Sequence, residues 1–266
     1  MMRSSIKIGS VMGIPIYLHY SFLLILPFLA WSFGNNIKGL AEYVDVPLSM
    51  EGSSPYIWGF ILVVALFGGV LLHELGHSFV ALRKGIKIRG ITLMIFGGVA
   101  QLEEMPTKPG EEAEVAIAGP VVSFVLGIAC YTAVHLIGKD VNPALAFTLA
   151  YLGYINVFLG LFNLIPAFPM DGGRILRSLL AKRLPFVAAT KVAAGLGKFL
   201  AIAFGIFGLV GGNLFLVLIA LFVYVGASQE YQFTVVKATL DGFRVRDLMT
   251  EDVSTVETGT TVRALV

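Results

Sequence analysis

The stretch Phe60–Leu82 reads FILVVALFGGVLLHELGHSFVAL and is the clearest indication of the fold class. Its 23 residues can cross a membrane as one helix, since a hydrocarbon core needs about 20 apolar residues. Three ionisable side chains, His73, Glu74 and His77, interrupt the apolar run. Ionisable groups inside a membrane span are costly and mark functional sites. We therefore predict a membrane-spanning helix with a functional site built into it.

The composition of the whole chain points to the same environment. The 266 residues are 57% hydrophobic and 14% charged, whereas about 25% of residues are charged in ordinary globular proteins. A soluble fold of this size needs a polar shell that this chain cannot supply, and the apolar content also excludes disorder. The net charge of +2, without a long basic face, argues against a nucleic-acid partner. The lipid bilayer is the predicted surrounding.

Apolar segments of membrane-spanning length recur about six times, which predicts an α-helical polytopic membrane protein. Two shorter stretches, Ser5–Ile16 and Ile86–Leu102, contain β-branched residues in partial alternation and predict strands. The second stretch is expected to bend at Gly97 and Gly98. We expect these strands to form a small sheet close to the second span. The predicted spans are Tyr17–Phe33, Tyr56–Leu82, Ala113–Ile137, Ala144–Ile165, Ala188–Val210 and Leu214–Val236.

Positive charge is distributed unevenly among the loops. With a cytoplasmic N-terminus, the outside loops hold only Lys38 and Lys139. Because loops rich in Lys and Arg stay inside, we predict a multi-pass protein of the cell membrane. Its N-terminus, its sheet and the opening of its functional site are then cytoplasmic. The inside cations in this orientation include Arg3, Lys7, Arg83, Lys84, Lys87, Arg89, Lys108, Arg174, Arg177, Lys182, Arg183 and Lys191.

The motif HELGH has the spacing of a metal site. His73 and His77 are four residues apart, so on a helix they share one face and can hold one cation. Glu74 can reach a water on that cation without binding the metal itself. The sequence thus predicts one zinc ion with Glu74 as its acid/base. The alternative is a metal-free buried contact between Glu74 and the two imidazoles.

A catalytic zinc takes three protein ligands, and Asp171 is the candidate for the third. It lies in Asn163–Gly173, which reads NLIPAFPMDGG. Pro166 and Pro169 force an extended path, and such irregular backbone is tolerated in a membrane where it lines a wet cavity. The alternative is that Asp171 only caps the helix that starts at Gly172.

Other polar residues have simpler interpretations. His19 in the first predicted span is expected to make a structural hydrogen bond rather than to reach the metal. An acidic run around two prolines is interpreted as a solvated loop. Its members are Glu103, Glu104, Glu111, Glu112 and Glu114.

Together these motifs resemble the site-2 protease family of intramembrane zinc metalloproteases. HELGH on an early span is followed, about 90 residues later, by Asn163, Pro166 and Pro169-Met-Asp171-Gly-Gly. The resemblance covers nearly the whole membrane region. Its supporting pieces are Gly13-Ile14-Pro15, Phe96-Gly97-Gly98 and Ala118-Gly119-Pro120.

The resemblance implies a role for each motif residue. His73, His77 and Asp171 would bind zinc, and Glu74 would be the catalytic acid/base. Asn163 would stabilise the oxyanion or hold substrate. The implied reaction is hydrolysis of a peptide bond in or near a transmembrane segment of a membrane-protein substrate. Because such a substrate must unwind and find new hydrogen-bond partners, we expect an edge strand within Ile86–Leu102 to receive it by β-addition.

The C-terminal part differs from the rest. Val245–Val266 is charged and Thr-rich, and it is similar to the opening of a CBS domain. We therefore divide the chain into a metalloprotease domain, residues 1–240, and the start of a truncated CBS domain, residues 241–266. About 22 residues cannot bury a core, so nucleotide binding is not expected from this tail.

Two other functions fit an intramembrane metal site. A metal-ion transporter also places histidines and acids inside the membrane, but it should show several ligand sets along a path. A scaffold that binds zinc without cleaving anything is the second alternative. Glu74 between the histidines favours the protease over both.

Overall fold

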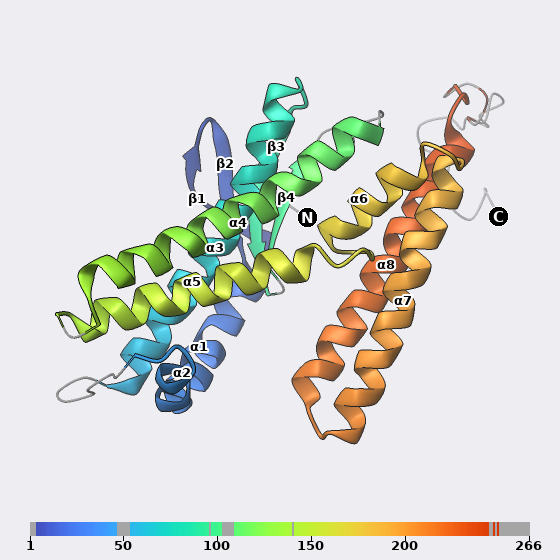
Figure 1. Ribbon diagram of the computed structural model, residues 1–266. Helices are drawn as coiled ribbons and strands as arrows, with labels where there is room; N and C mark the ends of the chain where they lie inside the picture. The colour runs from blue at the N-terminus through green and yellow to red at the C-terminus, as the bar shows by residue number, and fades with distance from the viewer. Residues whose placement is uncertain are drawn as a thin grey trace, which may run out of the picture.

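The structure is a computed structural model that describes residues 4–46, 54–95, 97–102, 109–139, 141–244, 247 and 249. Helices dominate it, and four strands form one sheet (Figure 1). Most of the predicted CBS segment (residues 245, 246, 248 and 250–266) and the acids Glu103 and Glu104 lie outside the described residues. The helices are α1 (Tyr20–Asn35), α2 (Ile37–Tyr43), α3 (Pro55–Arg83), α4 (Pro109–Ile137), α5 (Pro143–Asn163), α6 (Asp171–Leu180), α7 (Phe186–Val210) and α8 (Leu214–Leu240).

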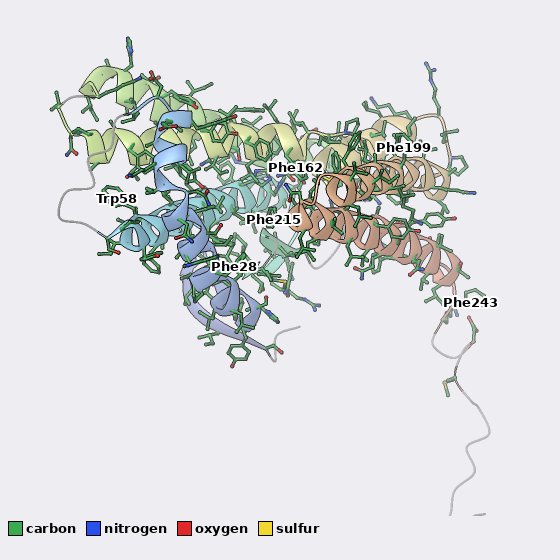
Figure 2. The ribbon with its side chains drawn as sticks, turned by 90° about the horizontal axis from the view of Figure 1, so that it is seen from below. Phe28, Trp58, Phe162, Phe199, Phe215 and Phe243 are labelled. Atoms are coloured by element: carbon green, nitrogen blue, oxygen red, sulfur yellow. The ribbon has the colours of Figure 1, made fainter. Side chains whose placement is uncertain are left out.

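Five of the described helices, α3, α4, α5, α7 and α8, are long and apolar enough to cross a membrane. The pair α1 and α2, bent by 69°, makes a sixth candidate span. Large apolar side chains project from their outer surfaces (Figure 2): Phe28, Phe199 and Phe215 are 52%, 66% and 60% exposed. Apolar surface on this scale suits lipid rather than water. The predicted polytopic helical class is confirmed.

The first predicted span begins too early. Tyr17 to His19 belong to a strand, and α1 begins only at Tyr20. The His19 ring makes this boundary, because its Nδ1 accepts a hydrogen bond from the Ser21 backbone amide and lies 2.8 Å from the Ser21 hydroxyl. His19 thus has the expected structural role, as the N-cap of the helix.

The sheet has the strand order β1-β2-β3-β4, from β1 (Ser5–Val11), β2 (Ile14–His19), β3 (Ile88–Met94) and β4 (Gly97–Leu102). Two antiparallel hairpins, β1–β2 and β3–β4, join through a parallel contact between β2 and β3. Both predicted strand regions are present, and both β3 and β4 pack against α3. The tight β1–β2 turn needs positive φ at two residues, Met12 and Gly13.

Helix α6 is the junction of the molecule (Figure 1). On one side α4 pairs with α5 and with α3, and on the other α7 and α8 form a long hairpin. The short α6 contacts both α4 and α7. Small residues let the backbones meet: a Cβ on Gly76 of α3 would lie 2.9 Å from the Ala118 carbonyl oxygen of α4.

Candidate metal centre

Two helices bring three ligand-type side chains together. His73 and His77 lie one turn apart on α3, with ring centroids 4.8 Å apart, and are only 3% and 9% exposed. Asp171 is the first residue of α6. Its Oδ2 lies 3.1 Å from His73 Nε2 and 3.2 Å from His77 Nε2. The three candidate ligand atoms are all within 4.8 Å of one another.

Helix α4 fixes the orientation of both imidazoles. His77 Nδ1 donates to the Val115 carbonyl oxygen at 2.7 Å, and His73 Nδ1 lies 2.8 Å from the fully buried Ser123 hydroxyl. With both Nδ1 atoms engaged, both Nε2 atoms turn toward Asp171. Zinc-binding histidines are held in this way, by a hydrogen bond from the other ring nitrogen. The sequence interpretation missed Ser123 and Val115, because nothing in their local sequence marks them.

Gly119 keeps the space between the two rings free. A Cβ at this position of α4 would lie 2.2 Å from His77 Nε2 and 2.6 Å from His73 Nε2. Any side chain there would fill the position that a cation between the two nitrogens would take. The site therefore has the donor set and the space for zinc, with two imidazole nitrogens and one carboxylate oxygen.

The backbone before α6 places Asp171 beside the two imidazoles. The Phe168 amide bonds the Ala193 carbonyl of α7, and the Phe168–Pro169 peptide is cis. The chain then turns so tightly that a Cβ on Gly172 would lie 2.3 Å from the Leu164 carbonyl oxygen. This is the close approach that glycine permits.

The alternative that Asp171 only caps α6 does not describe the structure. Met170 occupies the N-cap position, and the Asp171 carboxylate points to the imidazoles instead. Burial alone would raise the pKa of this carboxyl. The neighbouring charge of His77 and the hydrogen bonds from both rings outweigh burial, so the pKa of Asp171 lies well below its usual range.

The Glu74 side chain extends from α3 to the sheet. Its Oε2 accepts a hydrogen bond from the Ala100 backbone amide of β4 at 3.2 Å. A Cβ on Gly98 would lie 2.7 Å from Glu74 Cγ, so the lack of a side chain at Gly98 of β4 makes room for Glu74. The candidate acid/base therefore sits where the sheet edge meets the pair of imidazoles.

Of two further sequence interpretations of polar residues, the one for Asn163 stays untested and the one for Glu112 is wrong. The Asn163 amide donates to the Leu159 carbonyl at 3.0 Å, one turn back in α5, so its contact is with its own helix. Its role at the oxyanion stays a prediction. Glu112 was interpreted as part of a solvated loop, and this is wrong: it is 3% exposed and ion-paired with Arg177. Long-range packing buries this acid, which its local sequence does not reveal.

Comparison with known proteins points to one family. Residues 61–146 and 138–204 match Peptidase family M50. A zinc metalloprotease from Methanocaldococcus jannaschii is 42% identical over 94% of this chain and 67% of its own length. A protein from Synechocystis, provisionally named a zinc metalloprotease, is 34% identical over 98% of this chain and 69% of its own.

A solved structure agrees with these relatives. The site-2 protease from Methanocaldococcus jannaschii superposes with a TM-score of 0.60 at 39% identity, covering 96% of this chain and all of that one. The chain spans about two thirds of the length of the two curated relatives.

Proposed function

The chain belongs to peptidase family M50, the site-2 protease family, and we propose that it cleaves membrane proteins within the bilayer. Its relatives and its apolar helices make it a multi-pass membrane protein of the zinc metalloprotease kind. The finer proposal is hydrolysis of a peptide bond in or near a transmembrane segment of the substrate. The observation that carries it is the convergence of His73, His77 and Asp171 beside Glu74.

The residues divide the chemistry among them. His73, His77 and Asp171 would hold one zinc ion, which supplies Lewis-acid chemistry when it is bound. Glu74 would take a proton from the attacking water and pass it to the leaving amine. Asn163, which ends α5 eight residues before Asp171, would stabilise the oxyanion or hold substrate.

Substrate binding is proposed to use β4. A transmembrane helix has its peptide groups hydrogen-bonded internally, so it must unwind before its carbonyl can be attacked. The outer edge of β4 would receive the unwound segment by β-addition. The hydrogen bond from the Ala100 amide to Glu74 supports this choice, because it places the outer edge of β4 next to the acid/base.

The remaining proposals concern the chain as a whole. We propose that residues 1–240 form the protease domain and that residues 241–266 begin a CBS region. We also propose that the N-terminus and the opening of the site face the cytoplasm. A transporter is the weaker candidate, because the described residues contain one group of side chains close enough to hold a metal rather than several along a path.

One assay separates the candidate functions. The purified protein is incubated with a single-span reporter protein, with and without a chelator, and the products are mapped by mass. We expect one cut in or near the span, which chelation abolishes and added zinc restores. Cleavage that ignores the chelator contradicts the proposal. So does zinc flux in proteoliposomes without any cleavage, which would favour the transporter.

A further inference from the structure

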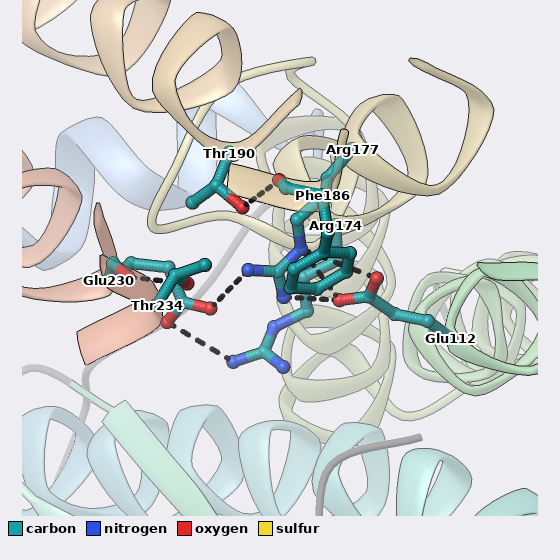
Figure 3. Close-up of polar contacts among 7 residues, drawn as sticks. All are labelled: Glu112, Arg174, Arg177, Phe186, Thr190, Glu230 and Thr234. Carbon is teal, nitrogen blue, oxygen red and sulfur yellow. Dashed lines mark hydrogen bonds and ion pairs between the residues drawn. The ribbon is translucent and has the colours of Figure 1, made fainter. Parts of the chain in front are cut away.

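A second polar cluster surrounds Arg177 of α6, the helix that begins at Asp171 (Figure 3). The guanidinium is 2% exposed and binds the Glu112 carboxylate of α4 through Nε and a terminal nitrogen. Its other terminal nitrogen donates to Glu230 of α8 at 2.9 Å. Arg174 approaches the same Glu230 at 3.9 Å. The buried Arg177 guanidinium thus links three helices, α4, α6 and α8.

The Arg177 guanidinium also packs against the turn before α6, the segment that leads into Asp171. Its central carbon lies 4.7 Å from the ring centroid of Phe168 and 4.8 Å from that of Phe186. Phe168 precedes Asp171 by three residues, and its backbone is bonded to α7. Arg177, in the last turn of α6, therefore contacts both the turn before α6 and the first residue of α7.

On the other side, the partner of Arg177 belongs to the helix that orients the histidines. Glu112 lies one turn before Val115, whose carbonyl binds His77, and the same helix carries Ser123 against His73. The Glu112–Arg177 pair thus links α4, which orients the two imidazoles, to α6, which carries the Asp171 carboxylate.

Stability alone is a weak explanation for such a pair. Buried ion pairs are often no more stabilising than apolar side chains of the same size, because both charges lose their hydration. Their geometry is specific, however, since a planar guanidinium fixes two carboxylates in set directions. The ends of the helices favour the same arrangement, because Glu112 is in the first turn of α4 and Arg177 in the last turn of α6.

We propose that Arg177 is a positioning residue for the metal centre. Paired with Glu112 and Glu230 and stacked on Phe168, it sets Asp171 at the distance from His73 and His77 that a single ion requires. The inference rests on the proposed metal site, but it concerns a residue that touches neither metal nor substrate.

The test measures coordination directly. Zinc is replaced by Co²⁺, whose visible spectrum reports ligand geometry, and retention of the metal is titrated against a chelator. In Arg177→Lys the charge remains but the planar fork is lost. We expect an altered cobalt spectrum and metal affinity about 10- to 100-fold weaker, the usual effect of removing support behind a ligand. Lys139→Met is the control, because it removes an exposed ion pair with Asp45 away from the site.

A second variant distinguishes a loss of positioning from a loss of folding. Glu112→Gln with Arg177→Gln removes both charges together, so neither is left buried alone, and Glu230 keeps Arg174 nearby. We expect it to remain helical and to lose metal affinity as Arg177→Lys does. If both variants keep the wild-type spectrum and affinity and lose only melting temperature, the positioning role is overturned. If the wild-type protein binds no cobalt, the metal site itself is overturned.

Discussion

At the scale of single residues, Glu74 and the two histidines are separable in function. The Glu74 carboxylate is bonded to the Ala100 amide, whereas both imidazole Nε2 atoms face Asp171. Glu74→Gln keeps the size and hydrogen-bonding reach of the side chain but removes the base. We predict unchanged zinc content by elemental analysis and cleavage at least about 100-fold slower, since acid–base catalysis contributes about 10²- to 10⁴-fold. Near-normal turnover would show that another group is the base.

Gly119 permits a sharper test of the metal position. In Gly119→Ala the added methyl group would lie 2.2 Å from His77 Nε2, so we predict loss of bound metal and of cleavage. Gly195→Ala is the matched control, because a Cβ there, also within a helix, meets nothing within 4 Å. This control should keep its metal and gain up to about 1 kcal/mol of stability from helix propensity. Full metal binding by Gly119→Ala would place the ion elsewhere.

At the scale of the elements, the edge of β4 has a testable role. The Ala100 amide points to Glu74, so it is free of the β3–β4 ladder. Ala100→Pro removes this edge donor and leaves the ladder to β3 in place. Because the substitution also removes the hydrogen bond to Glu74, cleavage of every substrate should slow. With zinc still bound, we predict a larger loss for membrane-spanning substrates than for a short unstructured peptide that needs no unwinding.

The opposite edge of the sheet supplies the control for Ala100→Pro. Ile8 lies at the bulge of β1, where the pairing with β2 shifts, and its side chain is 55% exposed. Ile8→Pro should therefore leave cleavage of both kinds of substrate unchanged. Normal cleavage of membrane-spanning substrates by Ala100→Pro would remove β-addition at β4 from the mechanism.

The sequence was most informative about the helices in which hydropathy and length agree. The span predicted at Tyr56–Leu82 is α3, Pro55–Arg83, to within one residue at each end. The start of α1 was missed because Tyr17 to His19 are an apolar end of a strand that runs straight into a helix. Short apolar runs do not reveal which of the two they form. The cap made by His19 is a side-chain contact that only the structure shows.

At the scale of the molecule, the candidate site combines local and long-range information. The spacing of His73 and His77 is local, so the sequence could predict their pairing. Ser123 and the Glu112–Arg177 pair act across 50 and 65 residues of sequence, and no local pattern identifies them. The junction helix α6 carries both Asp171 and Arg177, so the packing of the two helix groups against it decides the geometry of the site.

The orientation in the membrane is a property of the whole molecule, and the single cysteine makes it testable. Cys130 is 5% exposed, so a membrane-impermeant thiol reagent should leave the parent protein unlabelled. Lys139 lies in the α4–α5 turn and Arg183 between α6 and α7. We predict that Lys139→Cys is labelled in intact cells and Arg183→Cys only after permeabilisation, because cation-rich loops stay inside. The reverse labelling pattern would place the N-terminus and the opening of the site outside the cell.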